Sequence, residues 1–486
     1  METPPALLHE VWARTPSEAQ AYIRALEARV ETLTSMVHAL QEQVGTLQEQ
    51  LNQTSRNSSR PPSSDPPQLQ CPRRPRGKRR RGGQPGHPGH TRTLLPIEAV
   101  DEVVVLKPEE CPQCHALLSG SDPKPWRHQV IEIPPIKPVV TEYQWHQLVC
   151  AACGEVTRAS WPRGVPSGTY GPRVQATVAL YTGAYRLSKR TTQQMMDDVF
   201  GVPLSVGTIS QLEQATTEAV AAPVEEAQTA VQAQTVAHLD ETRWRQGSQR
   251  AWLWVAVTIV VTVFVVRLSR GAEVARALLG EAFSGILVTD RYSAYNWYPV
   301  RWRQVCWAHL LRDFEAMCDR GGRSKELGDA LLAQTHQMFT WWHRVRDGTL
   351  QRSSFRSAMT PLRREMERLL EAGSRCGVPK TAGTCQDILK RRAALWTFVQ
   401  VAGVEPTNNT AERAIRPGVL WRKGSFGTQS AEGSRFVESM LTVVATLKQQ
   451  QRNVLEYLTA ACTAALRGEA APSLLPESDQ KPQAAA

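Results

Sequence analysis

The sequence predicts a multidomain α+β protein with an N-terminal coiled coil, a zinc-ribbon-like domain and an α/β core that is interrupted by a helical insertion. Three observations lead to this prediction: a heptad repeat near the start, two CxxC pairs, and a succession of apolar segments that carry single acids. At 486 residues the chain has room for about three domains of roughly 150 residues each. Its 41% hydrophobic and 21% charged residues exclude a fibrous or wholly disordered chain.

The first element is a heptad repeat within residues 18–52. The a positions are mostly Val or Ile and the d positions are Leu, a combination that favours a parallel two-stranded coiled coil. A helix docked on the chain's own core is the alternative, but the repeat continues without a polar interruption. We therefore expect at least a homodimer. The seam consists of Ile23, Leu26, Val30, Leu33, Val37, Leu40, Val44, Leu47 and Leu51.

Residues 53–95 predict a flexible basic linker, because a segment rich in Ser, Pro, Gly and Arg buries too little apolar area to offset its ordering entropy. A charge run is often only a solvated tether. The net charge of +11 favours contact with double-stranded DNA, since a dense run of cations displaces counterions from phosphates. The basic residues are Arg73, Arg74, Arg76, Lys78, Arg79, Arg80 and Arg81.

Two CxxC pairs predict a zinc-binding domain over residues 96–165. Each pair can present two thiolates to a tetrahedral ion, so that two pairs form a closed structural Zn²⁺ site. We expect alternating residues such as those of 139–149 to form strands between the pairs. The ligands are Cys111, Cys114, Cys150 and Cys153; the substitutes His115, His128 and His146 are of a kind more often found as surface polar residues.

The cysteine pattern and the apolar segments predict the compartment. Paired and scattered cysteines without a disulfide framework are typical of a reducing compartment. The N-terminus lacks a basic flank followed by an apolar run, so we expect no secretory signal. The apolar residues 251–266 are fewer than the roughly 20 that a membrane helix needs. We therefore expect a cytoplasmic protein.

Residues 170–230 predict two or three short helices, with a break at Gly201–Pro203 and a new helix after Ser205. This spacing is compatible with a DNA-binding helix-turn-helix segment. Ordinary helical packing explains the same pattern equally well. The residues that would face phosphates or base edges are Lys189, Arg190, Thr208, Ser210 and Gln211.

The core is expected in residues 231–313 and 402–450. A strand that contains Asp240 is followed by two apolar strands within 251–266, a helix, a short strand that ends at Asp290, and a strand that runs into a helix. This order is that of a ribonuclease-H-like fold, in which the first and fourth strands are neighbours. Asp240 and Asp290 are therefore expected to meet.

Two adjacent carboxylates repel each other unless cations compensate them, so the pair predicts a divalent-metal site. Two Mg²⁺ or Mn²⁺ ions about 4 Å apart can activate an attacking oxygen and stabilise a leaving one on a phosphodiester. The third acid is Glu412, in the first turns of a helix that Asn408 or Asn409 can cap. The rival acids, expected in salt bridges or at the surface, are Glu241, Asp313 and Glu315.

Several residues are expected around this site. His309 lies one helical turn from Asp313 and either sits beside the metals or DNA or is a structural histidine. Residues 314–401 predict a helical insertion, in which Trp341 and Trp342 are expected to be packed rather than stacked on bases. Residues 451–486 predict a C-terminal helix and a disordered tail. The basic cluster that can hold the cut strand is Arg413, Arg416, Arg422 and Lys423.

These motifs together resemble the bacterial transposases of the insertion-sequence sixty-six family. The resemblance covers nearly the whole chain, in the family's order: the NSSRPPSSD and RRGGQPGHPGH linker, the paired CxxC turns, HLDETRW, LVTDRYSAY, CWAHLLRDF and NNTAERAIRP. It implies catalytic Asp240, Asp290 and Glu412, zinc on the four cysteines and a zipper over 23–51. It also implies a protein of the bacterial cytoplasm that is associated with the nucleoid. Two departures are Arg291, where many relatives are expected to have glycine, and a hairpin near Thr258 without an Asn-Gly or Asp-Gly turn.

We therefore expect a DNA transposase that binds the ends of its element. It would activate water to nick a strand and then direct the freed 3′-hydroxyl onto target DNA, with small accessory proteins as possible partners. Two alternatives stay open: a non-catalytic DNA-binding regulator derived from a transposase, and a ribonuclease-H-like nuclease acting on RNA hybrids or junctions. The fold alone does not separate them.

Overall fold

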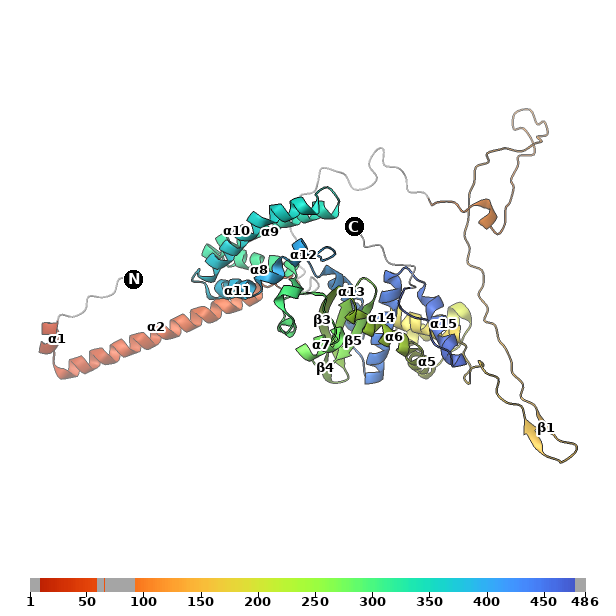
Figure 1. Ribbon diagram of the computed structural model, residues 1–486, viewed down its shortest axis with the longest axis horizontal. Coiled ribbons are helices and arrows are strands. Elements are labelled where there is room, and N and C mark those ends of the chain that lie inside the picture. Colours follow the sequence, from red (N-terminus) through yellow and green to blue (C-terminus); the bar gives the residue numbers. More distant parts are fainter. Residues whose placement is uncertain (1–8, 59–64, 66–91, 477–486) are drawn as a thin grey trace.

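The computed structural model describes residues 9–58, 65 and 92–476, which form a mixed α/β protein (Figure 1). Its central five-stranded sheet has the order β5-β4-β3-β6-β7. The strands are β3 (Val236–Gln246), β4 (Gln249–Val257), β5 (Thr262–Arg267), β6 (Ile286–Thr289) and β7 (Arg303–Val305). β3, β4 and β5 are antiparallel, whereas β6 pairs in parallel with both β3 and β7. The first and fourth strands of the sheet are thus direct neighbours.

The β4–β5 hairpin turns without the Asn-Gly or Asp-Gly pair that such a tight turn usually carries. The Thr258 hydroxyl accepts the backbone N–H groups of Val260 (3.2 Å) and Val261 (3.0 Å). The Thr258 N–H donates to the Val261 carbonyl at 2.9 Å. A threonine side chain therefore closes this turn, as short polar side chains often do in turns.

The outer edge of β5 is covered by α14 (Ala431–Gln449). Three alternate N–H groups of β5 donate to side chains spaced four residues apart on this helix: Thr262 to Thr446, Phe264 to Thr442 and Val266 to Glu438. Since strand residues alternate and helix residues recur every turn, the two periods match along the edge. The helix thereby protects an edge that could otherwise pair with another chain.

Helices before and after the sheet pack on two cores: the main core of the sheet, and a smaller one formed by Val178, Met196, Val202, Leu204 and Ile209. These helices are α3 (Pro172–Ala179), α4 (Lys189–Phe200), α5 (Val206–Ala219), α6 (Ala221–Gln232), α7 (Ala272–Leu279) and α15 (Val454–Arg467). The expected break is present: Gly201 ends α4 in the left-handed region (φ 62°), and the Ser205 side chain caps α5. Beyond α15, Leu474 is fully buried in the main core, so part of the expected tail is packed. Residues 477–486 lie outside the described residues.

Between β7 and α13 (Asn409–Ser425) the chain forms a helical layer with its own core. Its helices are α8 (Trp307–Asp319), α9 (Gly322–Arg346), α10 (Arg352–Ser374), α11 (Pro379–Lys390) and α12 (Thr397–Gln400). Trp342 packs against Phe355 and Phe398, with ring centroids 5.9 and 5.3 Å away, and Trp341 packs at the margin of the same core. Both tryptophans are thus packed, as expected.

The N-terminal part contains α1 (His9–Arg14) and α2 (Ser17–Leu51), and α2 extends away from the sheet as one long helix (Figure 1). The following residues, Thr54–Ser58, make defined contacts although they were expected to be flexible: the Asn57 amide donates to Asp319 at 2.7 Å. Within 96–165 the only described strands are β1 (Gln147–Val149) and β2 (Val156–Arg158). β1 lies in the segment 139–149 that was expected to supply strands, whereas residues 139–146 form none. None of the described helices has the length and apolar character needed to cross a bilayer.

Candidate active site

Three separate elements bring the three selected acids together near the C-terminal end of β6. Asp240 lies within β3, Asp290 directly follows β6, and Glu412 is in the first turn of α13. The parallel register pairs His238 with Val288, so Asp240 and Asp290 come two residues later on neighbouring strands. The electrostatics agree, since Asp290 and Glu412 both act on Asp240.

The N-terminus of α13 is fastened to β3 by one buried asparagine. The Asn408 amide donates to the Leu239 carbonyl at 2.7 Å, and its oxygen lies 3.2 Å from the His238 Nδ1. Asn408 occupies the N-cap position, but its side chain makes no capping bond, so the expected capping role was wrong. It acts instead as a bridge that sets where Glu412 stands relative to Asp240.

Asp240 carries most of the unfavourable electrostatics. Burial raises its pKa well above the ordinary value, and the negative charges of Glu241, Asp290 and Glu412 raise it further. One backbone N–H, that of Glu241, donates to the carboxylate at 2.9 Å. Among the described residues the oxygens of Asp240, Asp290 and Glu412 do not all lie within 4.8 Å of one another. The three acids thus form a loose group in which the negative charges of the carboxylates repel one another.

Glu241 lies beside these acids, a position that was not expected from the sequence. Its side chain is only 2% exposed, pairs with Arg270 at 2.7 Å and accepts a hydrogen bond from the Tyr295 hydroxyl. Burial, followed by the charge of Asp290, raises the pKa of Glu241. The expectation of a salt-bridge partner is met, but the residue lies beside the acids rather than away from them. Its position directly after Asp240 was the available signal.

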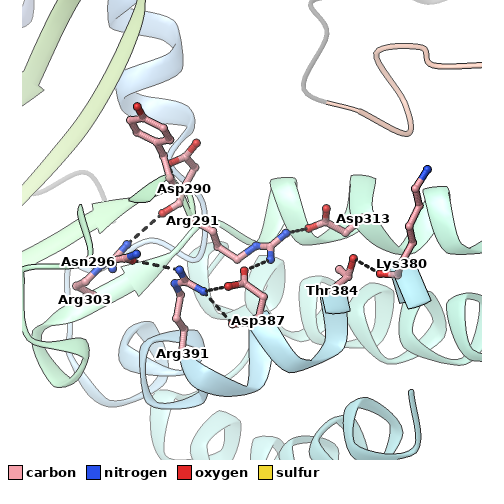
Figure 2. A network of polar contacts seen from close by, with 10 residues as sticks. Asp290, Arg291, Asn296, Arg303, Asp313, Lys380, Thr384, Asp387 and Arg391 are labelled. Carbon is pink, nitrogen blue, oxygen red and sulfur yellow. Dashed lines mark hydrogen bonds and ion pairs between the residues drawn. The ribbon is translucent and has the colours of Figure 1, made fainter. Parts of the chain in front are cut away.

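Arg291, the departure from the expected glycine, links the end of β6 to the helical layer. Its guanidinium contacts Asp313 of α8 at 2.5 Å and Asp387 of α11 at 2.6 Å (Figure 2). Arg303 donates to the Asp290 carbonyl at 3.2 Å and so holds the neighbouring residue. A cavity of about 150 Å³ opens here, lined by Ser58, Asp290, Arg291, Tyr292, His309, Arg312 and Asp313.

His309 lies beside Glu412, with Nδ1 and Oε1 3.7 Å apart. Both atoms are buried and neither has a hydrogen-bond partner. The buried Cys306 approaches the same pair, and its thiol was not singled out from the sequence. Burial raises the pKa of Cys306 to about 12. Cysteine followed three residues later by histidine at a strand end was a signal that could have indicated this cluster.

The predicted DNA-binding residues divide into three groups. Arg190, Gln211, Arg413, Arg416 and Lys423 are exposed, as a DNA contact requires. Lys189 is paired with Glu213 at 2.7 Å and donates to Ser210, and Arg422 donates to the Thr242 hydroxyl at 3.1 Å and to the Arg243 carbonyl. These two cations have structural partners. The basic run, Arg73, Arg74, Arg76, Lys78, Arg79, Arg80 and Arg81, lies outside the described residues.

Each CxxC pair forms a tight turn. The His115 N–H donates to the Cys111 carbonyl at 2.9 Å, and the Gly154 N–H donates to the Cys150 carbonyl at 2.8 Å. Hydrogen bonds within each turn lower the pKa of Cys111 and of Cys150, which favours the thiolate that zinc binds. In the described part of the chain, no three of the four sulfur atoms gather within 4.8 Å. The turns therefore fit zinc in their donor chemistry, but the two pairs are not brought together.

Comparison with known proteins adds family matches to this geometry. Residues 167–435 match a family described as "Transposase IS66 family", and residues 108–154 match "zinc-finger binding domain of transposase IS66". Residues 7–93 match a family of unknown function (DUF6444). Over 249 residues the sequence is 30% identical to the uncharacterized protein y4qI of Sinorhizobium fredii, an alignment that covers 45% of this chain and 44% of that relative. The chain thus spans less than half the length of this curated relative.

Proposed function

Since the chain belongs to the transposase IS66 family, we propose that it cleaves DNA at the ends of its element and joins them to target DNA at one carboxylate site. Asp240, Asp290 and Glu412 are the catalytic residues of this proposal. The observation that carries it is their convergence, from two strands and a distant helix, into a group in which Asp290 and Glu412 raise the pKa of Asp240.

The donor set fits a hard divalent cation. Carboxylates that repel one another are stabilised by Mg²⁺ or Mn²⁺, which prefer oxygen ligands, and Glu412 Oε1 is buried without a partner. Asp240, Asp290 and Glu412 would hold the ions. Bound there, two such cations supply the positive charge that activates an attacking oxygen and stabilises the leaving one on a phosphodiester. The order of the five strands supports a ribonuclease-H-like core over 231–313 and 402–450.

The chain's own residues position the acids and the DNA. Asn408 holds α13 against β3, and Arg270 with Tyr295 engages Glu241 next to Asp240. Arg413 and Arg416 are exposed on α13 within a turn or so of Glu412, where they would contact phosphates on the strand being cut. A neighbouring cavity of about 260 Å³ extends this surface, and its lining includes Phe339, Trp342, His343, Arg346, Glu405 and Arg413.

The other parts would gather DNA and a second copy of the chain. Residues 18–52 would form the coiled coil, 53–95 the basic linker and 96–165 the zinc-binding domain with one structural Zn²⁺ on the four cysteines. Residues 170–230 would supply further DNA contacts through Arg190 and Gln211, whereas 314–401 and 451–486 would support the core. The family match at 108–154 spans all four cysteines and supports the zinc assignment.

Cleavage of a labelled element end by the purified chain tests the proposal. We expect cleavage with Mg²⁺ or Mn²⁺, no cleavage by Asp240→Asn or Glu412→Gln, and nearly unchanged DNA affinity in both variants. Glu315→Gln, a substitution of a half-buried acid on α8, is the matched control and should retain cleavage. Binding without cleavage by the wild type under every divalent metal would overturn the proposal in favour of a regulator. Preferential cleavage of a hybrid duplex would favour a nuclease.

A further inference from the structure

A second group of potential ligands lies beside the acids, with different chemistry. The Cys306 Sγ, the His309 Nδ1 and the Glu412 Oε1 all lie within 4.8 Å of one another. In the part of the chain that the structure describes, no other group of three or more His, Cys, Asp or Glu residues is this compact. One sulfur, one nitrogen and one oxygen donor thus converge at the starts of α8 and α13.

Two of these donor atoms lack what buried polar atoms require. His309 Nδ1 and Glu412 Oε1 are buried, make no hydrogen bond and face each other at 3.7 Å. Leaving a buried polar atom unsatisfied costs roughly 1–3 kcal/mol, so such atoms usually have a partner. A cation between the two atoms would satisfy both.

The backbone fixes the two helix starts against each other. The Trp307 N–H donates to the Pro406 carbonyl at 2.9 Å, and the Asn408 N–H donates to the Cys306 Sγ at 3.1 Å. Cys306 is the N-cap of α8, and His309 follows in the first turn, so both side chains are presented from a rigid position. The Asn408 N–H that donates to the sulfur also fixes where the Cys306 Sγ lies beside His309 and Glu412.

We propose that Cys306, His309 and Glu412 form a binding site for Zn²⁺, or for a similar thiophilic divalent cation, distinct from the carboxylate site and sharing Glu412 with it. Thiolate, imidazole and carboxylate are the three ligand types of zinc in proteins, whereas Mg²⁺ prefers oxygen alone. Tetrahedral ligands of zinc are roughly 3.3–3.6 Å apart, so small side-chain movements would close the site. Three protein ligands leave the fourth position open.

The shared glutamate gives this site a consequence that rests on the proposed function. The Glu412 Oε1 that binds this cation would no longer be available as a ligand for an ion held by Asp240 and Asp290. Zn²⁺ bound here would displace the thiol proton to solvent, hold the glutamate and oppose cleavage supported by Mg²⁺. The site would make the enzyme sensitive to free zinc.

Metal binding by the full chain tests the site independently of activity. Equilibrium dialysis against Zn²⁺, followed by metal analysis, should give one more ion per chain for the wild type than for Cys306→Ser. The affinity of that ion should fall at least about 100-fold, since loss of a direct ligand should exceed the effect of losing an outer partner. Cys385→Ser, which replaces another buried thiol, should retain the ion. Equal zinc content in wild type and Cys306→Ser would overturn the proposal.

A second variant and a second readout keep the test decisive. Should circular dichroism show that Cys306→Ser is unfolded, His309→Asn takes its place with the same expected loss. With Co²⁺ as the probe, the thiolate charge-transfer absorption that remains when Cys111, Cys114, Cys150 and Cys153 are all replaced by serine should disappear when Cys306→Ser is added. A spectrum unchanged by Cys306→Ser would contradict the site.

Cleavage assays test the expected inhibition by zinc. Zn²⁺ added to a Mg²⁺-supported cleavage reaction should inhibit the wild type and Cys385→Ser, but inhibit Cys306→Ser at least about 100-fold more weakly, relative to each variant's own rate. If zinc binds at Cys306 but the wild type cleaves no DNA, the proposed function fails and the metal site stands. If cleavage proceeds and zinc content is independent of Cys306, only the metal site fails.

Discussion

The carboxylate of Asp240 is unfavourable for the stability of the metal-free fold, although the proposed reaction needs it. Three neighbouring acids and burial oppose its charge, while one backbone N–H favours it. Replacement by asparagine keeps the shape and removes the repulsion, so Asp240→Asn should raise the free energy of unfolding of the metal-free chain by on the order of 1 kcal/mol. Urea denaturation in the presence of EDTA measures this change.

A comparison with an acid that has a favourable partner serves as the control. Asp329 is exposed and paired with Lys325 at 2.7 Å, so Asp329→Asn should lower the stability only slightly. Mg²⁺ should stabilise the wild type and not Asp240→Asn. A clear loss of stability in metal-free Asp240→Asn would show that the carboxylate is structural.

Arg291 makes the opposite kind of contribution, because it compensates two acids from different helices. Its side chain is 18% exposed and holds Asp313 and Asp387 together beside the end of β6 (Figure 2). Arg291→Ala would leave the Asp313 carboxylate without its partner and should lower the free energy of unfolding by about 3 kcal/mol. Chemical denaturation checks the value.

The matched substitution is Arg323→Ala, whose exposed pair with Glu326 should contribute less than about 1 kcal/mol. Arg291→Lys keeps the charge but loses the planar fork, so it should fall between the wild type and Arg291→Ala. Equal losses for Arg291→Ala and Arg323→Ala would contradict the bridging role.

At the scale of elements, the contact between α14 and the edge of β5 depends on hydroxyl groups. The Thr442 hydroxyl accepts the buried Phe264 N–H at 3.0 Å. Thr442→Val keeps the volume but leaves this N–H unsatisfied, which should cost about 1–3 kcal/mol of stability. Thr463→Val on α15, where the hydroxyl bonds only to its own helix, should cost less than about 0.5 kcal/mol. Hydrogen exchange at Phe264 should accelerate only in Thr442→Val.

The same elements show how far local sequence signals reach. Strand patterns placed β3 through β7 in the correct order, and the Gly201 and Ser205 signals placed the boundary between α4 and α5, because these signals act within a few residues. Asn408 was expected to cap its own helix, but it bonds to β3 instead. The approach of Cys306 and His309 to Glu412 was not foreseen either. Both outcomes depend on how distant segments pack, which no short window of sequence encodes.

In the zinc-binding region, too, the sequence predicts local features but not the longer-range structure, for a different reason. The spacing of Cys111, Cys114, Cys150 and Cys153 predicts a metal site from donor chemistry, and each turn has the expected local hydrogen bonds. The strands expected between the pairs are mostly missing in the described structure, and apolar residues such as Val139 and Val140 are exposed. A domain whose order depends on a metal is specified by its ligands more than by its core.

For the whole molecule, the decisive feature is a helix whose apolar seam is left exposed by the other residues that the structure describes. Along α2, Leu33 and Leu40 are 55% and 59% exposed, and Val30 and Val37 are exposed to a similar degree. Full burial of each such side chain contributes about 1.5–3 kcal/mol, more than enough in sum for a stable pair of helices. The seam favours a second copy of this chain over docking on the chain's own core.

The C-terminal end of α2 would connect such a dimer to the part of the chain that carries Asp240, Asp290 and Glu412. Glu49 lies 3.6 Å from Arg320, which directly follows α8, and also contacts Lys380 of α11. A coiled coil anchored in this way would hold two bodies at a defined separation. Such an arrangement suits a reaction that must hold two DNA ends at once.

Light scattering of the full chain tests this assembly. We expect a dimer or a larger even assembly for the wild type, and a monomer for the double variant Leu33→Glu and Leu40→Glu, because four charges would face one another in each dimer seam. The control double variant, Thr32→Glu and Ser35→Glu, adds the same charge at outward positions of α2 and should remain dimeric. If the monomeric variant still binds one element end but no longer pairs two ends, the coiled coil serves assembly rather than DNA affinity. An assembly unchanged by the seam charges would place the dimer contact elsewhere in the chain.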